Sequence, residues 1–206
     1  MHARVAKRPS VASEARRRQI LDAAVATIAA DGLAKASFAA IADRAGLSSV
    51  GLISYHFAGR DELIGQIVAD YYASIAAHMQ ARMIGIGSPA AALDAYIAGV
   101  IDYIGTHPAE MKALTEIFLR GAMNHGRAED DAATGPLEDI LLAGQRAGEF
   151  RQFDVPIMAA LIQRAVDGLP FLLASRPELE ARSFADSYAA EVLTSFRLAT
   201  RAETAP

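Results

Sequence analysis

The sequence predicts an all-α fold with about nine helices. Across most of the 206 residues, apolar side chains recur at every third or fourth position, which places them on one face of a helix. No short run combines sustained alternation with enrichment in β-branched residues, as a strand would. Apolar residues make up 52% of the chain, which is enough for a hydrophobic core and too many for a wholly disordered protein.

The first four helices are delimited by serine caps and glycine stops. A serine hydroxyl accepts hydrogen bonds at a helix start, and glycine adopts the left-handed conformation that ends a helix. Asp61 and Glu62 suit the first turn of the fourth helix, where carboxylates offset the helix dipole. The expected N-caps are Ser13, Ser37 and Ser48, the glycines after the expected ends are Gly32, Gly46 and Gly59, and the expected ranges are 13–31, 38–45, 48–57 and 60–84.

Five further helices are expected beyond residue 89. Pro108 fits the first turn of its helix, because the amide hydrogen that proline lacks has no helical partner there. Residues 124–136 are polar and acidic, so we expect a mobile connection in this stretch. The expected ranges are 90–106, 108–123, 137–147, 155–174 and 178–200.

Composition excludes several classes of protein. The chain has no cysteine, which rules out a disulfide scaffold, a thiolate metal site and a cysteine nucleophile. Its start lacks the apolar segment of a signal peptide, and its longest apolar runs fall short of the ~20 residues that a spanning helix needs. We therefore expect a cytoplasmic protein that spans no membrane and carries no cofactor.

The charge is distributed unevenly. The formal net charge of the chain is -4. Residues 1–63 hold nine basic and six acidic residues, a net charge of +3, whereas the remaining residues carry -7. Such a split is typical of a protein whose one end contacts nucleic acid, although a solvated basic tail gives the same pattern.

Residues 37–57 have the spacing of a helix-turn-helix motif. Ala42 is the small residue where the two helices cross, and Gly46, four positions later, makes the turn. The expected serine caps, Ser37 and Ser48, place hydroxyl and backbone N–H groups where DNA phosphates would lie. An ordinary helical corner remains the alternative. The expected buried positions are Ile41, Ala45, Leu47, Leu52 and Tyr55.

The stretch from Arg16 to Leu63 resembles the N-terminal domain of the TetR family of bacterial transcriptional regulators. The segments RQILDAAVATIAADG, SFAAIADRAGLSS and GLISYHFAGRDEL follow one another at the spacing of that family. The resemblance implies a helix-turn-helix DNA-binding domain at 13–59, a disordered basic arm at 1–12, and a helical ligand-binding and dimerisation domain at 60–206.

The resemblance also implies roles for single residues. Ser37 would cap the second helix and touch the DNA backbone, Gly51 would let the recognition helix approach the groove, and Tyr55 and His56 would contact phosphates. Between Gly46 and Phe57 the chain has one residue more than the usual pattern, so the start of the recognition helix is open by one position. The candidate DNA-binding residues are Arg16, Ser37, Arg44, Ser48, Ser49, Val50, Gly51, Ser54, Tyr55, His56 and Arg60.

The remaining helices are expected to sense a ligand and to form a homodimer. A two-fold dimer reads two half-sites about 34–36 Å apart, which compensates for the weak affinity of one small domain. Methionine and aromatic residues suit an adaptable pocket, although they suit a core equally well. The candidate pocket residues are Tyr72, Met79, Tyr103, Met111, Phe118 and Met123. The candidate interface residues are Ala159, Ile162, Val166, Leu169, Leu172, Tyr188, Val192 and Phe196, with Ala160, Ala165, Phe184, Ala189 and Leu193 on the same stripes.

The sequence therefore favours a ligand-responsive regulator, with a repressor preferred, that binds a palindromic double-stranded DNA operator and is released by an unknown small molecule. A helical interaction module without DNA binding is one alternative. A helical enzyme is another, but no nucleophile elbow, phosphate-binding loop or paired-cysteine site is present. His107 and Glu110 could bind a metal, but a surface pair is the preferred interpretation.

Overall fold

The computed structural model describes residues 10–121, 127–176 and 178–202, and within these ranges the chain is helical without a strand. An isolated antiparallel bridge joins Phe150 to Arg201. The elements are α1 (Val11–Asp31), the short 3-10 helix η1 (Leu33–Lys35), α2 (Phe38–Arg44), α3 (Gly51–His56), α4 (Arg60–Met83), α5 (Pro89–Thr106), α6 (Pro108–Leu119), α7 (Arg127–Ala147), α8 (Val155–Ser175) and α9 (Ala181–Thr200).

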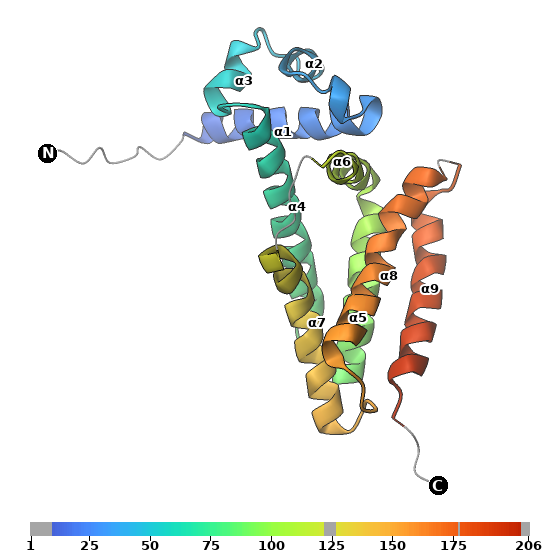
Figure 1. Ribbon diagram of the computed structural model, residues 1–206. Helices are drawn as coiled ribbons and strands as arrows, with labels where there is room; N and C mark the ends of the chain where they lie inside the picture. The colour runs from blue at the N-terminus through green and yellow to red at the C-terminus, as the bar shows by residue number, and fades with distance from the viewer. Residues whose placement is uncertain (1–9, 122–126, 177, 203–206) are drawn as a thin grey trace, which may run out of the picture.

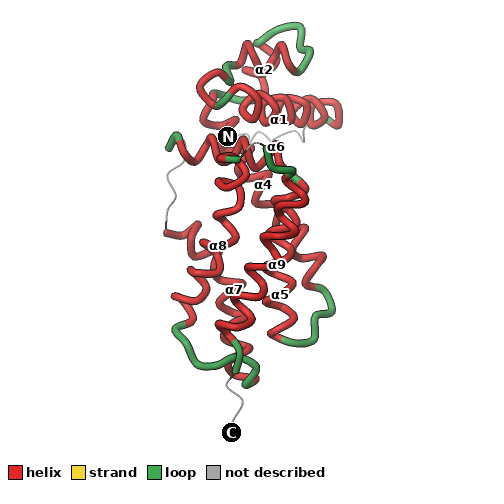
Figure 2. Tube along the Cα trace, turned by 90° about the vertical axis from the view of Figure 1, so that its right-hand side faces the viewer, coloured by secondary structure: helices red, strands yellow, loops and turns green. Residues whose placement is uncertain are grey.

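The helices form a small unit that lies across one end of an elongated bundle. In Figure 1, α1 runs across the top of the bundle, with α2 and α3 above it and α6 beneath it. Helix α4 starts in the upper unit and descends along the bundle, where α5, α7, α8 and α9 run lengthwise. The view in Figure 2, turned by a quarter, shows the same separation. Helices α4 and α6 are therefore the two elements through which the bundle meets the upper unit.

Polar side chains cap most of the helix starts. The hydroxyls of Ser37 and Ser88 accept from backbone N–H groups three residues later, and Asp154 and Glu180 do the same with carboxylates. The expected cap at Ser13 is wrong. Ser10 caps α1 by accepting from the N–H of Ser13, so the helix begins at Val11, one turn earlier than the sequence predicts. Residues 1–9 of the expected arm lie outside the described residues.

The expected mobile connection at 124–136 is wrong over most of its length. Helix α7 begins at Arg127 and continues through Pro136. The acidic composition indicated a loop, but polar residues are also compatible with the first turns of a long helix whose later part packs on the core. Leu137 and Leu141, in that later part, are fully buried. Residues 124–126 lie outside the described residues.

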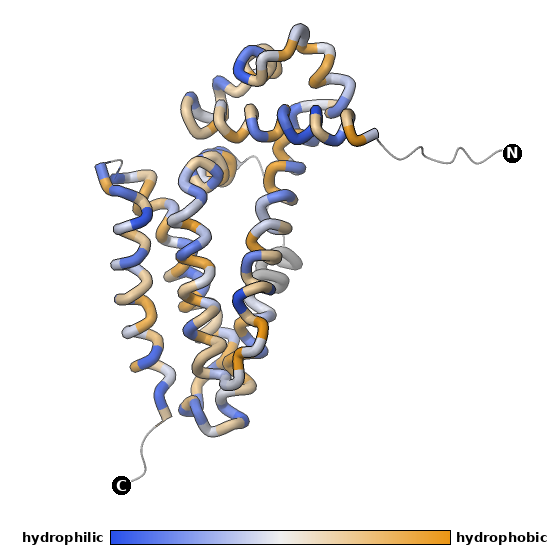
Figure 3. Tube along the Cα trace, turned by 180° about the vertical axis from the view of Figure 1, so that it is seen from behind, coloured by the Kyte–Doolittle hydropathy of each residue, from blue (hydrophilic) through white to orange (hydrophobic). Residues whose placement is uncertain are grey.

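The core of the bundle is built around α5. Leu93, Ile97, Ile101 and Ile104 form one buried stripe on this helix, with spacings of three and four residues. Helix α9 packs along α5 at the edge of the bundle. Figure 3 shows hydrophilic and hydrophobic residues alternating along α9, as a helix with one buried face requires.

Helix α8 combines a long apolar sequence with incomplete burial. Among the described helices, it alone is long and apolar enough to cross a membrane by length and composition, and only 33% of its most apolar window is buried. Its buried residues pack against α5, α6, α7 and α9, as in the core helix of a bundle. The helix therefore completes the core with one face and leaves a second apolar face uncovered in the single chain.

Candidate nucleic-acid interface

The upper unit is held by a small core that fixes α2 and α3 against α1. Ile20, Ala24 and Ile28 of α1 are buried, and they lie at the i, i+4 and i+8 positions that the sequence predicts. Ile41 of α2 is also buried in this core, as is Phe57, which directly follows α3. The core leaves the remaining faces of α2 and α3 in solvent.

The turn after α2 is the Schellman arrangement. Gly46 has a φ of 65°, the left-handed conformation that costs a glycine least. The N–H of Gly46 donates to the carbonyl of Asp43 at 3.0 Å, and the N–H of Leu47 donates to Ala42 at 2.9 Å. The sequence prediction that Gly46 stops the second helix is thus confirmed in detail.

Helix α3 begins later than the sequence predicts. Ser48 does not cap it, because the helix starts at Gly51 with Val50 in the cap position and no side-chain hydrogen bond. The N–H of Ile53 donates to the carbonyl of Val50 at 2.9 Å and closes the first turn. Residues 47–50 therefore form the connection between the two helices, which is longer than expected.

The later start also changes which residues of α3 are buried. Ile53 is fully buried and Phe57 is 1% exposed, so these two residues, four apart, face α1. Tyr55, expected in the core, is 80% exposed. Leu52 is half-buried. The expectation of a buried Tyr55 is wrong because the inward stripe of α3 contains Ile53, which places Tyr55 on the opposite side.

The outer face of α3 gathers most of the candidate DNA-binding residues. Val50, Gly51, Ser54 and Tyr55 are exposed, and so are Ser48 and Ser49 in the preceding connection. His56 is half-buried, with its ring edge-to-face against Tyr55 at a centroid distance of 5.1 Å. These side chains form a continuous exposed surface that consists of small, hydroxyl-bearing and aromatic groups.

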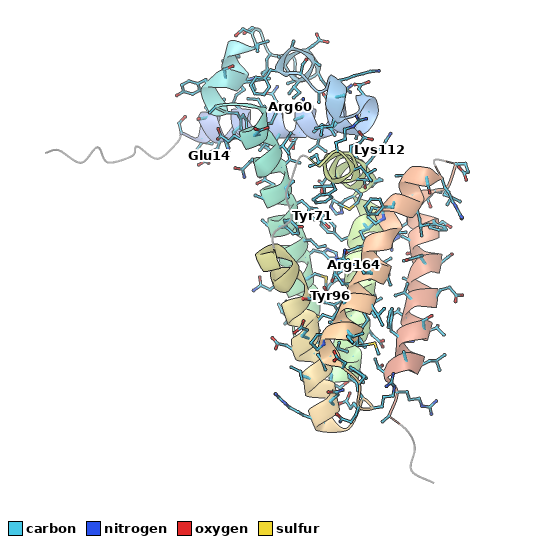
Figure 4. All side chains as sticks on the ribbon, in the orientation of Figure 1. Glu14, Arg60, Tyr71, Tyr96, Lys112 and Arg164 are labelled. Atoms are coloured by element: carbon cyan, nitrogen blue, oxygen red, sulfur yellow. The ribbon has the colours of Figure 1, made fainter. Side chains whose placement is uncertain are left out.

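The arginines predicted to contact DNA are partly engaged within the chain. Arg44 is exposed but forms an ion pair with Asp31 at 2.7 Å. Arg60, labelled in Figure 4 at the start of α4, donates to the carbonyl of Leu33 and is thereby held at η1. Arg16 is exposed on α1 and donates to Gln19 at 2.8 Å. Among these three, only Arg16 has no contact outside its own helix among the hydrogen bonds and ion pairs of the described residues.

Arg17 has a structural role that the sequence analysis missed. Its guanidinium donates to the carbonyl of His56 and to the side chain of Gln66, both at 2.8 Å. The same group lies 4.2 Å from the centre of the Phe57 ring. One side chain of α1 thus fastens the end of α3 to α4. No sequence signal identifies it, because its partners lie 39 or more residues away.

The candidate effector residues differ widely in burial. Tyr103 and Met111 are buried in the core, Met79 and Phe118 are half-buried, and Tyr72 is 42% exposed. Met123 lies outside the described residues. Neither of the two best-formed hollows of the described chain is lined by any of these residues. The predicted effector pocket stays a prediction.

The candidate interface residues divide into two groups. Ala159, Ile162, Val166 and Leu169 are fully shielded within one chain, and Val192 is 7% exposed, so their assignment to a dimer interface is wrong. Leu172, Tyr188 and Phe196 are only half-buried and remain available. Helix α8 has two apolar stripes, one that faces the core and one that faces solvent. The α8 residues expected at the interface lie mainly on the stripe that faces the core. The exposed large apolar residues of α8 and α9 are Ile157, Leu161, Phe171 and Leu198.

His107 and Glu110 belong to a hydrogen-bonded cluster. The His107 ring stacks on Tyr103 at a centroid distance of 4.0 Å, and the Tyr103 hydroxyl donates to Glu110 at 3.1 Å. Within the described ranges, no group of three or more potential metal ligands occurs. The cluster therefore joins α5 to α6.

Comparison with known proteins identifies the upper unit. Residues 20–67 match the family described as bacterial regulatory proteins, tetR family. The transcriptional regulator BetI of Cronobacter sakazakii is 34% identical over 105 residues, which cover 50% of this chain and 52% of the relative. BetI 1 of Chromohalobacter salexigens is 39% identical over 101 residues, covering 47% and 48%. The chain thus spans about half the length of the curated relatives that it matches.

Solved structures extend the similarity in fold to almost the whole chain. The fatty acid degradation regulator FadR of Bacillus halodurans superposes with a TM-score of 0.74 at 17% identity, covering 91% of this chain and 97% of that one. The matched relatives are regulators, not enzymes. The helix-turn-helix of α2 and α3 is a DNA-binding unit, and it lies within residues 20–67, the segment that matches the TetR family of bacterial transcriptional regulators.

Proposed function

We propose that this chain is a cytoplasmic transcriptional repressor that binds a palindromic DNA operator as a homodimer and releases it when a small molecule binds the bundle. The observation that carries the proposal is the exposed face of α3. Val50, Gly51, Ser54 and Tyr55 project from a helix whose opposite face is locked by Ile53. A rigid scaffold with an exposed recognition helix is the arrangement that reads base edges in the major groove.

The chemistry of this face suits DNA. Hydroxyl groups such as that of Ser54 donate to or accept from bases and phosphates, and the methyl groups of Val50 suit the methyl group of thymine. Gly51 adds no side chain, so the helix can approach the floor of the groove closely. The exposed cations Arg16 and Lys35 lie in the same unit and would follow the phosphate backbone.

The outer face of α8 supports a dimer. Ile157 is 60% exposed and Leu161 is 55% exposed, which places two exposed aliphatic side chains side by side in the first two turns of a long helix. Phe171 continues the same face towards the end of the helix. A second copy related by a two-fold axis would cover this face with the identical face of its own α8. Both recognition helices would then be presented to one DNA duplex.

The contact between the upper unit and the bundle supports release of DNA by an effector. The upper unit meets the bundle chiefly through α6 and α4, so a ligand that shifts these helices would displace α3. A differential affinity of about 1–3 kcal/mol between the two arrangements gives a useful response.

Selection of bound sequences from random duplex DNA tests the proposal. The wild-type chain should enrich a palindrome, and a Tyr55→Ala, His56→Ala double variant should lose it. Ile84→Ala serves as the control, because Ile84 is 78% exposed, lies just beyond α4 and belongs to none of the candidate sites. An absence of enrichment at low salt would contradict DNA binding. Enrichment of a site without internal symmetry would contradict the dimer.

A further inference from the structure

A hollow of about 110 Å³ lies where α1 meets α4 and α6. It is distinct from the recognition surface and contains none of the residues predicted for an effector pocket. Its walls come from both parts of the molecule, since α1 belongs to the upper unit and α6 to the bundle. The lining residues are Arg18, Leu21, Asp22, Val25, Ile67, Asp70, Tyr71, Ser74, Glu110 and Leu114.

One side of the lining is apolar. Leu21, Ile67 and Leu114 are each at most 5% exposed, and Val25 is half-buried. These side chains form a surface against which a short hydrocarbon chain can be removed from water. Each methylene buried there loses contact with water, which favours binding. The hollow therefore has an apolar contact area for part of a ligand.

The other side of the lining carries excess negative charge. Arg18 is its only cation, and it is already paired with Asp70 at 3.1 Å. Gln66 donates to the other oxygen of the same carboxylate at 2.8 Å. Glu110 accepts only from the neutral Tyr103 hydroxyl, and no ion pair or hydrogen bond in the described ranges involves the Asp22 carboxylate. Two negative charges thus face the hollow without a cation.

Tyr71 adds an aromatic wall with an unused hydroxyl. Figure 4 labels this residue on α4, on the side that faces the bundle. Burial, together with the negative charges of Asp167 and Glu110, raises the pKa of Tyr71, so the phenol stays neutral. Its hydroxyl makes no hydrogen bond to another residue of the described ranges. The face of a tyrosine ring attracts a cation, and the free hydroxyl can accept from an N–H group.

We propose that this hollow binds a small primary alkylammonium ion. The ammonium group would lie between Glu110, Asp22 and Tyr71, and the alkyl chain would lie on Leu21 and Leu114. The volume of about 110 Å³ corresponds to about four waters, given the ~30 Å³ that one water occupies, so an ammonium group with a short alkyl chain fits. A neutral ligand would leave both carboxylates without a cation, and an anion would be repelled.

Binding of the ammonium in the hollow changes the contact between the upper unit and α4. The Arg18–Asp70 pair links α1 to α4 in the lining of the hollow, and the added positive charge of a bound ammonium repels Arg18 and weakens this link. A weaker link loosens the upper unit from α4 and lowers operator affinity. This effect on DNA rests on the proposed function, whereas binding of the ion itself does not.

Calorimetric titration of the full chain without DNA tests the site. The probes are n-butylammonium, its neutral isostere 1-butanol, and butyrate, at constant ionic strength. We expect saturable binding of butylammonium alone, with a Kd of about 1 mM, as suits a ligand of this size. Equal binding of butanol, any preference for butyrate, or no saturable binding overturns the proposal.

Three variants test the assigned residues. Glu110→Gln keeps an oxygen for the Tyr103 hydroxyl and removes one charge, and Asp22→Asn changes an exposed side chain. Each should weaken butylammonium binding about tenfold, the value of one lost charge-assisted hydrogen bond. The control Glu191→Gln removes an exposed carboxylate on α9, outside the hollow, and should change nothing. Unchanged binding in both hollow variants overturns the assignment.

Fluorescence anisotropy with the selected operator separates the two proposals. If saturating butylammonium leaves operator affinity unchanged, the ion does not loosen the upper unit from α4, and the proposed effect on DNA binding is contradicted. Operator binding without any butylammonium binding leaves the regulator intact and refutes the ammonium site. Butylammonium binding without any operator binding refutes the proposed function and leaves the site intact.

Discussion

Helices α3 and α8 each keep one face in the core and one in solvent, but the two outer faces differ in chemistry. On α3 the exposed residues are small or bear hydroxyl groups, as in Gly51, Ser54 and Tyr55. On α8 the large exposed residues are mainly aliphatic and aromatic, as in Leu161 and Phe171, with the ion-paired Arg164 between them. A polar face keeps its water until a partner offers matching donors and acceptors, whereas an apolar face gains free energy from any apolar partner.

This difference separates recognition from assembly within one chain. The face of α3 gains little by self-association because its hydroxyls are already hydrated. The outer face of α8 is mainly apolar, and its exposed cation, Arg164, is paired with Asp167 at 3.2 Å. Substitutions on one face should therefore leave the function of the other intact, and this independence can be tested in order of expected effect.

The largest effect is expected for Leu161→Arg on α8. The substitution occurs twice in a symmetric dimer and places two cations in an apolar contact, so dimerisation should weaken by at least about 100-fold. Light scattering after size-exclusion chromatography measures it. Ile84→Arg is the matched control, since Ile84 is 78% exposed but lies just beyond α4. A Leu161→Arg chain that remains dimeric would show that α8 is not the interface.

The next effect is expected for Tyr55→Ala on α3. The exposed ring and hydroxyl would be lost without disturbing the core, so operator affinity should fall by at least about tenfold while the dimer persists. Tyr55→Phe distinguishes the hydroxyl from the ring. Anisotropy titrations measure the affinities. Unchanged binding in Tyr55→Ala would remove this residue from the recognition surface.

A smaller effect is expected for Gly51→Ala. An added Cβ would lie 3.5 Å from the Ser49 hydroxyl oxygen, an ordinary contact, so the fold should accept it. Alanine also favours the helix by up to about 1 kcal/mol, so thermal stability should not fall. Operator affinity should fall about fivefold if the helix approaches the groove closely at this point. Wild-type affinity would show that Gly51 does not face the DNA.

The smallest effect at neutral pH is expected on the inner face of α8. The Tyr96 hydroxyl donates to Gln163 at 2.9 Å, and burial raises the pKa of Tyr96 to about 12. The raised pKa contributes stability that is complete below pH ~10 and is lost as the pH rises towards 12. Tyr96→Phe should cost about 1 kcal/mol at pH 7 and flatten the alkaline decline. Urea unfolding measures both, and Tyr55→Phe, at an exposed tyrosine, should leave the decline as in wild type.

The sequence predicted helix boundaries well where the boundary depends on hydrogen bonds within one helical turn. The cap at Ser37 and the stop at Gly46 depend only on neighbouring backbone groups, and both are confirmed. The start of α3 depends on which residue meets α1, so Ile53 rather than a cap at Ser48 decided it. The sequence alone could not choose between the two registers, because Leu52 and Ile53 are equally apolar.

Long-range contacts explain the remaining errors. Ala159 and Leu161 both lie on apolar stripes of α8, and only the neighbouring helices determine which stripe is inside. The cations of the upper unit predicted a nucleic-acid contact, but the sequence could not show that Arg44 is paired with Asp31 or that Arg60 is held by Leu33. The uneven distribution of charge predicted which end of the chain contains the DNA-binding unit, but it could not predict which cations are free to contact DNA.

The single guanidinium of Arg17 joins α1, the end of α3 and the first turns of α4. The recognition helix therefore cannot tilt independently of α4. In a dimer, the positions of the two α4 helices would then set the distance between the two recognition helices. The spacing of the two operator half-sites would have to match that distance. One inserted base pair between half-sites adds about 3.4 Å and about a tenth of a turn. Such an insertion should weaken binding more than one base substitution inside a half-site.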